Sequence, residues 1–423
     1  MAAGCRCCGR SCDKCDSAAE EGYAPMSLDL DNSLWKRVKF GDVVESSKEK
    51  VDPTDGTVSR VVAGEHMDSD VLKIHRWGSV AEGYLGPAFH RRFRPGQVLY
   101  GSRRTYLRKV AVADFDGVCA NTTFVLSSKD ENYLLPDFLP WVMTSEPFHA
   151  FAIAESKGSV NPYVNFSDLA RYEFDLPPLN QQRRIADLLW TIQSHVSTKQ
   201  SISMRLDDLR DALFHAELES GQKDSGWVSR PVSEVVISGP TNGKSATSND
   251  EQRGIPTLSI SAVRHGRIEA GKAVKYVDIS PREVEAFVLQ DEDFLVVRGN
   301  GNKQLTGLGG LVDDALPDGC FFPDLLIRLR FDPDKILPRF ASEQWNSASC
   351  HQALLRNAKS TNGIWKINGK DVKQHRLVVP PIPEQIRILG DISDIQSAKV
   401  KVDAEVRDIR SLRAKLIAEV FTS

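Results

Sequence analysis

The sequence predicts an α/β (α+β) protein with pseudo-two-fold duplication, in which two tandem domains are separated by two long helices packed as an antiparallel coiled coil. Three observations predict it: an internal repeat, a heptad pattern in both copies, and strand-like runs ahead of a helical stretch in each half. The repeat aligns LPPLNQQRRI at 176–185 with VPPIPEQIRI at 379–388, an offset of 203 residues. Because each copy closes one half of the chain, the segments between the copies are expected to do the work.

Length and composition limit the number of domains and the classes of partner that the chain can have. The chain has 423 residues, of which 41% are hydrophobic and 26% charged, with a net charge of −3. This leaves room for two or three folded domains. The slight acidity does not exclude a nucleic-acid partner, because binding depends on where the charge lies. No apolar run approaches the ~20 residues that span a bilayer. We therefore expect no membrane partner and a cytoplasmic location.

Five of the eight cysteines lie in the first fifteen residues. Cys12 and Cys15 have the spacing of zinc ligands, but no second well-spaced pair accompanies them. We therefore expect residues 1–26 to be a disordered leader without metal, and a true start at Met26 remains open. The five cysteines of this leader are Cys5, Cys7, Cys8, Cys12 and Cys15.

The two halves begin alike. Trp35 and Trp227 each open a short run that predicts an entry strand. Strand-like runs follow in both halves, VLKIHRW, GQVLYGS, KVAVADF and TTFVLSS in the first and FLVVRGN, GGLVDD and LLIRLRFD in the second. A helical stretch then closes each half, and Pro140 and Pro147 break the regularity of the first one. The predicted parts are a first domain at 27–176, a helix at 177–222, a second domain at 223–379 and a helix at 380–423.

The heptad pattern predicts that the two long helices, at 181–218 and 384–421, pack on each other. Leu188, Ile202 and Leu209 are the expected second row on the first helix, and Lys199 interrupts the pattern. Antiparallel packing is favoured, because a parallel pair would need a connection running back along the helix. The predicted seam comprises Ile185, Ile192, Leu206 and Leu213 on the first helix and Ile388, Ile395, Val402, Ile409 and Leu416 on the second. Two helices buried separately, each on its own domain, are the alternative.

Basic residues concentrate between His90 and Val110, where seven Arg or Lys residues stand without any Asp or Glu. Such residues neutralise phosphates, Arg can read guanine, and Asn and Gln suit adenine. The second half offers polar residues at the comparable place after a strand. We therefore expect double-stranded DNA to contact Arg91, Arg92, Arg103, Arg104, Lys109 and Lys157 in the first domain and Arg298, Asn300, Asn302, Lys303, Gln304 and Lys359 in the second.

Two other functions remain as alternatives. Asp137, Glu155 and Lys157 satisfy the loose PD…ExK pattern of metal-dependent nucleases, although the second half keeps only the lysine. A coiled-coil scaffold without a DNA role is the other alternative.

The Gly-rich segment at 239–245 has three residues between its glycines where a phosphate-binding loop has four. Neither Pro-Pro pair supplies the polar and aromatic neighbours of an amino-methyltransferase loop. No catalytic residue and no cofactor of its own are expected.

With the repeat in view, the chain resembles the specificity (S) subunits of type I restriction–modification systems over nearly all of residues 27–423. The resemblance rests on the segments LPPLNQQRRIADLL and VPPIPEQIRILGDI, on the helix ends LRDALFHAEL and LRAKLIAEVF, and on the openings at Trp35 and Trp227. The resemblance implies two target-recognition domains that each read one half of a split, asymmetric DNA target. It also implies spacer helices that dock two methyltransferase subunits, which use S-adenosylmethionine, and restriction/translocase subunits, which use ATP and Mg²⁺.

Overall fold

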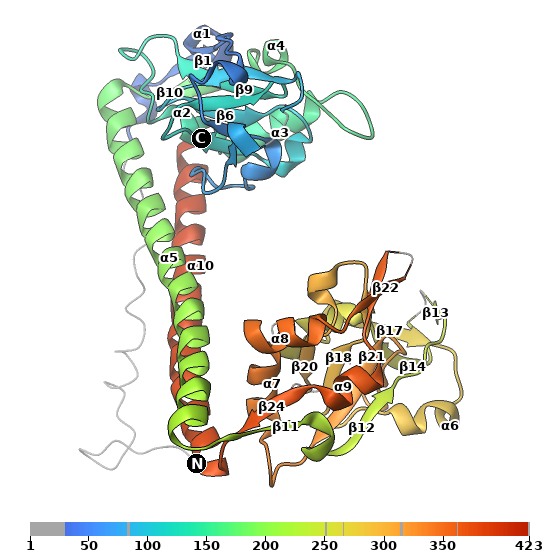
Figure 1. The fold of residues 1–423 in the computed structure, drawn as a ribbon. Coiled ribbons are helices and arrows are strands. Elements are labelled where there is room, and N and C mark those ends of the chain that lie inside the picture. The colour runs from blue at the N-terminus through green and yellow to red at the C-terminus, as the bar shows by residue number, and fades with distance from the viewer. Residues whose placement is uncertain are drawn as a thin grey trace, which may run out of the picture. The chain divides into compact units, whose positions relative to one another are not determined.

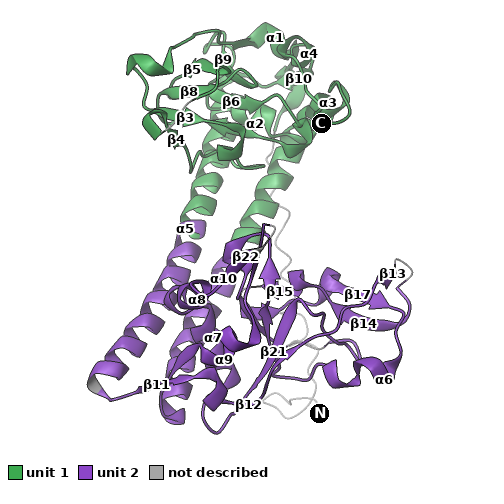
Figure 2. Cartoon of the chain, turned by 45° about the vertical axis from the view of Figure 1, so that its right-hand side comes forward, with its two compact units in different colours: residues 1–199, 405–423 green, residues 200–404 purple. Residues whose placement is uncertain are grey.

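The computed structural model describes residues 30–82, 85–249, 252–264, 266–313, 316–361 and 363–421. The predicted cysteine-rich leader lies outside these residues. The chain divides into two compact units, Met1–Lys199 with Glu405–Ser423 and Gln200–Ala404 (Figure 2). Each unit therefore combines one α/β domain with one part of each long helix.

Among its described residues the first unit holds three sheets and four short α-helices (Figure 1). The entry strand β1 (Lys36–Lys39) pairs antiparallel with the exit strand β10 (Glu173–Leu176), which closes the domain just before Pro177. The two four-stranded sheets have the orders β2-β9-β6-β7 and β4-β3-β8-β5. Their strands are β2 (Val44–Ser46), β3 (Arg60–Val62), β4 (Gly78–Ser79), β5 (Phe89–Phe93), β6 (Val98–Gly101), β7 (Val110–Val112), β8 (Gly117–Ala120) and β9 (Thr123–Ser128). The helices are α1 (Phe40–Val43), α2 (Leu139–Met143), α3 (Glu146–Ala154) and α4 (Phe166–Leu169).

The helical stretch of the first half is divided where its prolines indicated. Ser145 caps α3 by accepting a hydrogen bond from the amide of Phe148, and Pro147 lies in the first turn of α3. The predicted strand VLKIHRW does not form, since Lys73 makes only an isolated bridge to Val112.

The second unit is also closed by a pairing of its first and last strands. β11 (Val228–Pro231) pairs antiparallel with β24 (Arg376–Val379) just before Pro380. A six-stranded sheet has the order β12-β21-β18-β20-β16-β15, and two three-stranded sheets have the orders β13-β17-β14 and β19-β23-β22. The first nine of these strands are β12 (Val236–Asn242), β13 (Ser248–Asn249), β14 (Ile255–Leu258), β15 (Val263–Arg264), β16 (Gly266–Ile268), β17 (Val274–Val277), β18 (Phe294–Val297), β19 (Gly299–Asn300) and β20 (Gly309–Leu311). The others are β21 (Leu326–Phe331), β22 (Lys359–Thr361) and β23 (Ile364–Lys366), and the helices are α6 (Pro281–Val284), α7 (Pro338–Asn346), α8 (Ala348–Leu355) and α9 (Gly369–Gln374).

The long helices are α5 (Leu179–Asp224), of 46 residues, and α10 (Ile382–Phe421), of 40 residues. Both begin directly after the Pro-Pro pairs and so start earlier than predicted, and α5 also ends later, at Asp224 rather than Leu218. Pro383 lies in the first turn of α10, where the missing amide hydrogen of a proline costs no helical hydrogen bond. No helix in the described ranges has the length and apolarity needed to cross a membrane.

The two helices pack on each other in antiparallel orientation, as predicted, and contacts inside each unit show it. In the first unit Arg413 donates to Gln193, and Lys199 lies 2.5 Å from Glu405. In the second unit Lys399 lies 3.4 Å from Asp207, and Arg387 lies 2.6 Å from Glu217. Within each unit, positions further along α5 meet positions earlier along α10.

The seam follows the predicted heptad on one row and departs from it on the other. Ile202 and Leu209 are 38% and 51% exposed, so the prediction that they form the second row of α5 was wrong. That row is formed by Leu189, Val196 and Ser203, four residues rather than three after Ile185, Ile192 and Lys199. A heptad permits either spacing, and the domain core that buries Leu189 selects one. In the first row, Ile185, Ile192, Ile388 and Leu416 are buried, and Leu206, Leu213, Ile395, Val402 and Ile409 are half-buried.

Helix pairing and domain packing are not alternatives in this chain. The core of the first unit includes Ile185 and Leu189 from α5 together with Leu416 and Ile417 from α10. The core of the second unit likewise includes Phe214 and Leu218 from α5 with Ile388 and Ile392 from α10. Each domain therefore holds one end of both helices.

Candidate nucleic-acid interface

In each domain two segments without any carboxylate meet in one backbone ladder. In the first domain these are residues 90–113, with seven Arg or Lys, and residues 156–167. Arg103 forms a bridge with Tyr163, and the amide of Arg104 donates to the carbonyl of Pro162 at 2.6 Å. The ladder thus joins a predicted DNA-binding run to a second acid-free segment that lies some fifty residues further along the chain.

The predicted first-domain residues divide by their partners. Arg103, Arg104, Arg91 and Lys109 have no carboxylate within ion-pair distance among the residues that the structure describes. Arg103 is exposed with its guanidinium 5.9 Å from the Tyr163 ring, and Arg104 donates to the side chain of Asn161 at 3.2 Å. Arg91 donates to the carbonyl of Thr123 at 2.9 Å, and Lys109 to that of Gly64. Their positive charge is therefore available to a ligand.

Arg92 and Lys157 are already neutralised within the domain. Arg92 makes a two-pronged ion pair with Asp116, at 3.2 and 2.5 Å, which holds the pKa of that carboxyl below its ordinary value. Lys157 donates to Asp168 at 2.9 Å, and this hydrogen bond is the chief reason that the pKa of Asp168 is lowered. The structure gives both cations a role inside the fold, whereas the sequence placed all six residues together.

The second domain repeats the arrangement with different residues. Its carboxylate-free segments are 294–312 and 344–370, which carry Arg298, Lys303, Arg356, Lys359, Lys366 and Lys370. They meet where β19 pairs with β23, opposing Asn300 to Trp365. In the same sheet β23 pairs with β22, opposing Lys366 to Lys359.

Backbone hydrogen bonds establish which positions of the two domains correspond. In the first domain the amide of Val164 donates to the carbonyl of Ser102 at 2.9 Å, and in the second the amide of Ile367 donates to that of Arg298, also at 2.9 Å. The residues two positions further on are therefore equivalent: Arg104 in the first domain and Asn300 in the second.

The polar loop after β19 is shaped by its own side chains. The carbonyl oxygen of the Asn300 side chain accepts from the amide of Asn302 at 2.9 Å, and that of Asn302 accepts from the amide of Gln304 at 2.9 Å. Both turns leave the side-chain NH₂ groups free to donate, which is the group that meets an adenine N7. Gln304 is exposed, and the Lys303 ammonium lies 4.5 Å from the Trp365 ring. Arg298 instead donates to the carbonyl of Asp324 at 3.2 Å, while Lys359 is exposed.

The residues of the nuclease alternative are occupied elsewhere. Glu155 pairs with Arg171 and Lys157 with Asp168, while Asp137 is exposed. Within the described ranges no three His, Cys, Asp or Glu side chains lie close enough together to hold a metal ion. The pattern that suggested a nuclease therefore corresponds to two local ion pairs.

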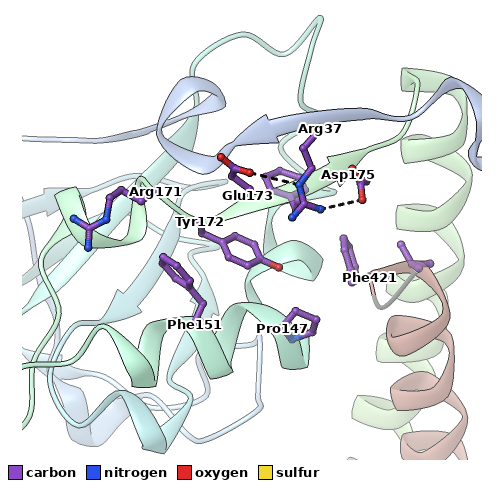
Figure 3. A pocket seen from close by; sticks show the side chains of 10 residues that line it. Arg37, Pro147, Phe151, Arg171, Tyr172, Glu173, Asp175 and Phe421 are labelled. Atoms are coloured by element: carbon purple, nitrogen blue, oxygen red, sulfur yellow. Dashed lines mark hydrogen bonds and ion pairs between the residues drawn. The ribbon is translucent and has the colours of Figure 1, made fainter.

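A surface cavity of about 520 Å³ lies beside the end of α10 in the first unit (Figure 3). Phe151, Tyr172 and Phe421 contribute its aromatic part. Arg37 in its wall is matched by Asp175 at 3.0 Å and Glu173 at 3.7 Å. This balanced lining contrasts with the carboxylate-free ladders and does not favour a polyanion.

Sequence reasoning missed Tyr163, Trp365 and the three-stranded sheet that holds Trp365. The available signals were the absence of acid over residues 344–370 and the alternating run GIWKI at 363–367. The second signal is too short to distinguish a strand from a loop, since only three residues pair on each side.

The fold and the two matched ladders define a class: duplicated α/β proteins whose two domains share one antiparallel helix pair. Residues 32–206 match the family model described as the type I restriction modification DNA specificity domain. The chain is therefore similar to the specificity subunits of type I restriction–modification systems, and the family model covers less than half of its length.

Individual relatives give the extent of the similarity. The chain is 29% identical over 266 residues to the EcoKI specificity subunit of Escherichia coli strain K12, covering 59% of this chain and 57% of that one. It is 25% identical over 306 residues to the StySPI specificity subunit of Salmonella potsdam, covering 68% and 64%. Each alignment thus spans less than two thirds of the relative.

Two solved structures share the fold. A chain from a study of complex assembly and conformational transition of the type I R-M system has a TM-score of 0.54 at 20% identity, covering 91% of this chain and 97% of that chain. The type I S subunit of M. genitalium has a TM-score of 0.52 at 13% identity, covering 94% and 98%. Both matches extend over both domains and both long helices.

Proposed function

We propose that this chain is the non-catalytic DNA-recognition subunit of a type I restriction–modification complex and reads a bipartite, asymmetric double-stranded target. One observation carries the proposal: two equivalent domains each build a carboxylate-free ladder, and the ladders differ in the polar side chain at the same position. Free cations suit the phosphate backbone, and different polar groups suit different bases.

The asymmetry of the target follows from the equivalent positions. Arg104 offers a guanidinium, which pairs with guanine O6 and N7, whereas Asn300 offers an amide, which pairs with adenine N6 and N7. Because the domains do not repeat each other at this position, the two half-sites should differ in sequence.

The partners are inferred from the similarity to type I specificity subunits. The chain would dock two modification (methyltransferase) subunits and, where present, restriction/translocase subunits in the cytoplasm. S-adenosylmethionine, ATP and Mg²⁺ would belong to those partners, and the chain would hold no cofactor of its own. The proposal keeps the DNA-contacting residues predicted from the sequence. In the first domain it gives Arg91, Arg103, Arg104 and Lys109, which no described carboxylate neutralises, priority over Arg92 and Lys157, which Asp116 and Asp168 neutralise.

The test is methylome sequencing of cells that express the methyltransferase partner with and without this chain. We expect methylation at a split, asymmetric site only when the chain is present. An unchanged methylation pattern with an active methyltransferase would refute the proposal. A gel shift with the partner present separates the scaffold alternative, which predicts no sequence-selective complex.

A further inference from the structure

We propose that the ribbon β22–β23 of the second domain enters the major groove edge-on, with Trp365 on one face of the ribbon against the base edges and Lys359 and Lys366 on the other face towards the phosphates. This inference rests on the proposed function and names the element that reads the second half-site. The DNA contacts predicted from the sequence in this domain include Lys359 of the ribbon, together with Arg298 and the loop at 300–304, but neither Trp365 nor Lys366.

Charge is the first argument. Lys359 and Lys366 are direct cross-strand partners in the ribbon, and Lys303 lies over the neighbouring ring of Trp365. Like charges directly opposite each other destabilise a strand pair. No carboxylate lies within ion-pair distance of any of the three lysines among the described residues. A polyanion would remove this repulsion, so the arrangement suits a bound nucleic acid.

Exposed apolar surface is the second argument. Ile364 is 41% exposed on the face of the ribbon that carries Lys366, and Leu305 is 44% exposed in the adjoining loop. Trp365 itself is half-buried beneath Lys303. Exposed aliphatic side chains and a half-buried indole that lie among cations fit a DNA groove, where thymine methyl groups accept apolar contact between phosphate rows. Trp is also one of the residue types enriched among the side chains that dominate binding energy at protein–protein interfaces.

Shape is the third argument. The major groove, about 12 Å wide, admits a two-stranded ribbon. The ribbon is joined through β19 to Asn300, so the loop at 300–304 and the ribbon form one continuous edge. Figure 1 shows β22 standing at the margin of its domain. The first domain has no equivalent ribbon in its described part, since Lys157 and Tyr163 make only an isolated bridge there.

The experiment measures binding of the full chain, with its methyltransferase partner, to duplexes carrying the complete target, over a series of salt concentrations. We expect Trp365→Ala to weaken binding about tenfold or more without changing the salt dependence. Lys359→Ala and Lys366→Ala should each lower the slope of log K against log salt by about 1 and leave base preference intact. Replacing purines of the second half-site by 7-deazapurines, which lack the major-groove N7, should weaken wild-type binding.

Lys401→Ala is the matched control, because Lys401 is an exposed lysine of α10. It should change neither affinity nor slope, and the first half-site preference of Trp365→Ala should be intact, which shows that the chain is folded. If Trp365→Ala binds normally while Asn300→Ala alone changes the second half-site preference, the ribbon does not read DNA and the inference is overturned. Failure of the proposed function looks different: the wild-type complex itself would show no sequence-selective binding.

Discussion

The side-chain oxygen of Gln182, in the first turn of α5, accepts a hydrogen bond from the backbone amide of Leu135 at 2.9 Å. The NH₂ group of Gln182 donates to the carbonyls of Tyr133 and Pro177, at 2.9 and 2.8 Å. The duplicate repeats this with Gln385, whose contacts are Leu337 at 2.8 Å, Lys335 at 3.0 Å and Pro380 at 2.8 Å. Each glutamine fastens a long helix to the loop ahead of the domain's helices.

Gln182→Ala should therefore lower the free energy of unfolding of the first unit by about 1–3 kcal/mol, because buried backbone groups lose their partner. Differential scanning calorimetry would measure it. Gln222→Ala, at an exposed position of α5, should leave the transition unchanged, and an equal loss in both variants would contradict the assignment.

The division of the basic residues predicts unequal effects on DNA binding. Arg103→Ala should weaken binding and reduce the salt slope by about 1, because its charge is free to meet a phosphate. Arg92→Ala should leave the slope unchanged, because Asp116 already neutralises Arg92. Binding isotherms across salt concentrations distinguish the two, and a larger slope change for Arg92→Ala would show that the division is wrong.

The helix pair predicts how the half-site gap can be changed. Seven residues added between Gln200 and Ser201 in α5 and between Asp403 and Ala404 in α10 preserve the heptad and keep the pairs Lys199–Glu405 and Ser203–Asp403. The insertion lengthens the pair by roughly 10 Å, or about three base pairs. Methylome sequencing should show unchanged half-sites with a longer gap.

The same insertion in α5 alone is the control. It should abolish methylation, because the helix ends can no longer reach both domain cores in register. If the double insertion leaves the gap unchanged, the helices do not set it.

The middle of the helix pair is joined by a polar group of side chains in the second unit. Lys399 donates to Ser203 at 2.9 Å and to Asp403 at 3.0 Å, and lies 3.4 Å from Asp207. Lys399→Ala should cost about 1 kcal/mol, since these contacts are only partly buried. A double-mutant cycle with Asp207→Ala should show a coupling of roughly 0.5–1 kcal/mol. A coupling of zero would mean that this ion pair contributes nothing.

Two buried histidines predict acid sensitivity. Burial lowers the pKa of His149 and of His375 to about 4, from an ordinary 6.5. Between these pH values the unfolded chain binds protons that the folded chain does not, so stability is lost as pH falls from 6.5 towards 4. The loss should reach roughly 2–3 kcal/mol per histidine at pH 4.5. His149→Gln should shrink the stability difference between pH 7.5 and 4.5, measured by urea unfolding; an undiminished difference would refute the assignment.

Much of the helix pair could be predicted from the sequence, because a heptad reports which residues face a partner whatever that partner is. The second seam row could not, since the sequence allows both Leu188 and Leu189 and only burial against the domain core favours Leu189. The strands β6, β7, β9 and β21 followed from β-branched and aromatic runs, whereas the three-residue strands β22 and β23 gave too little pattern to detect.

The duplication, the two long helices and the concentration of cations can be derived from the sequence, because repeats, heptads and charge runs are patterns along the chain. Which of the cations are free depends on the fold. Asp116 and Asp168 lie 24 and 11 residues from the Arg92 and Lys157 that they neutralise. The strand that opposes Asn300 comes from some 65 residues further along the chain. Side chains this far apart meet only because the backbone ladders and the packed cores hold them together.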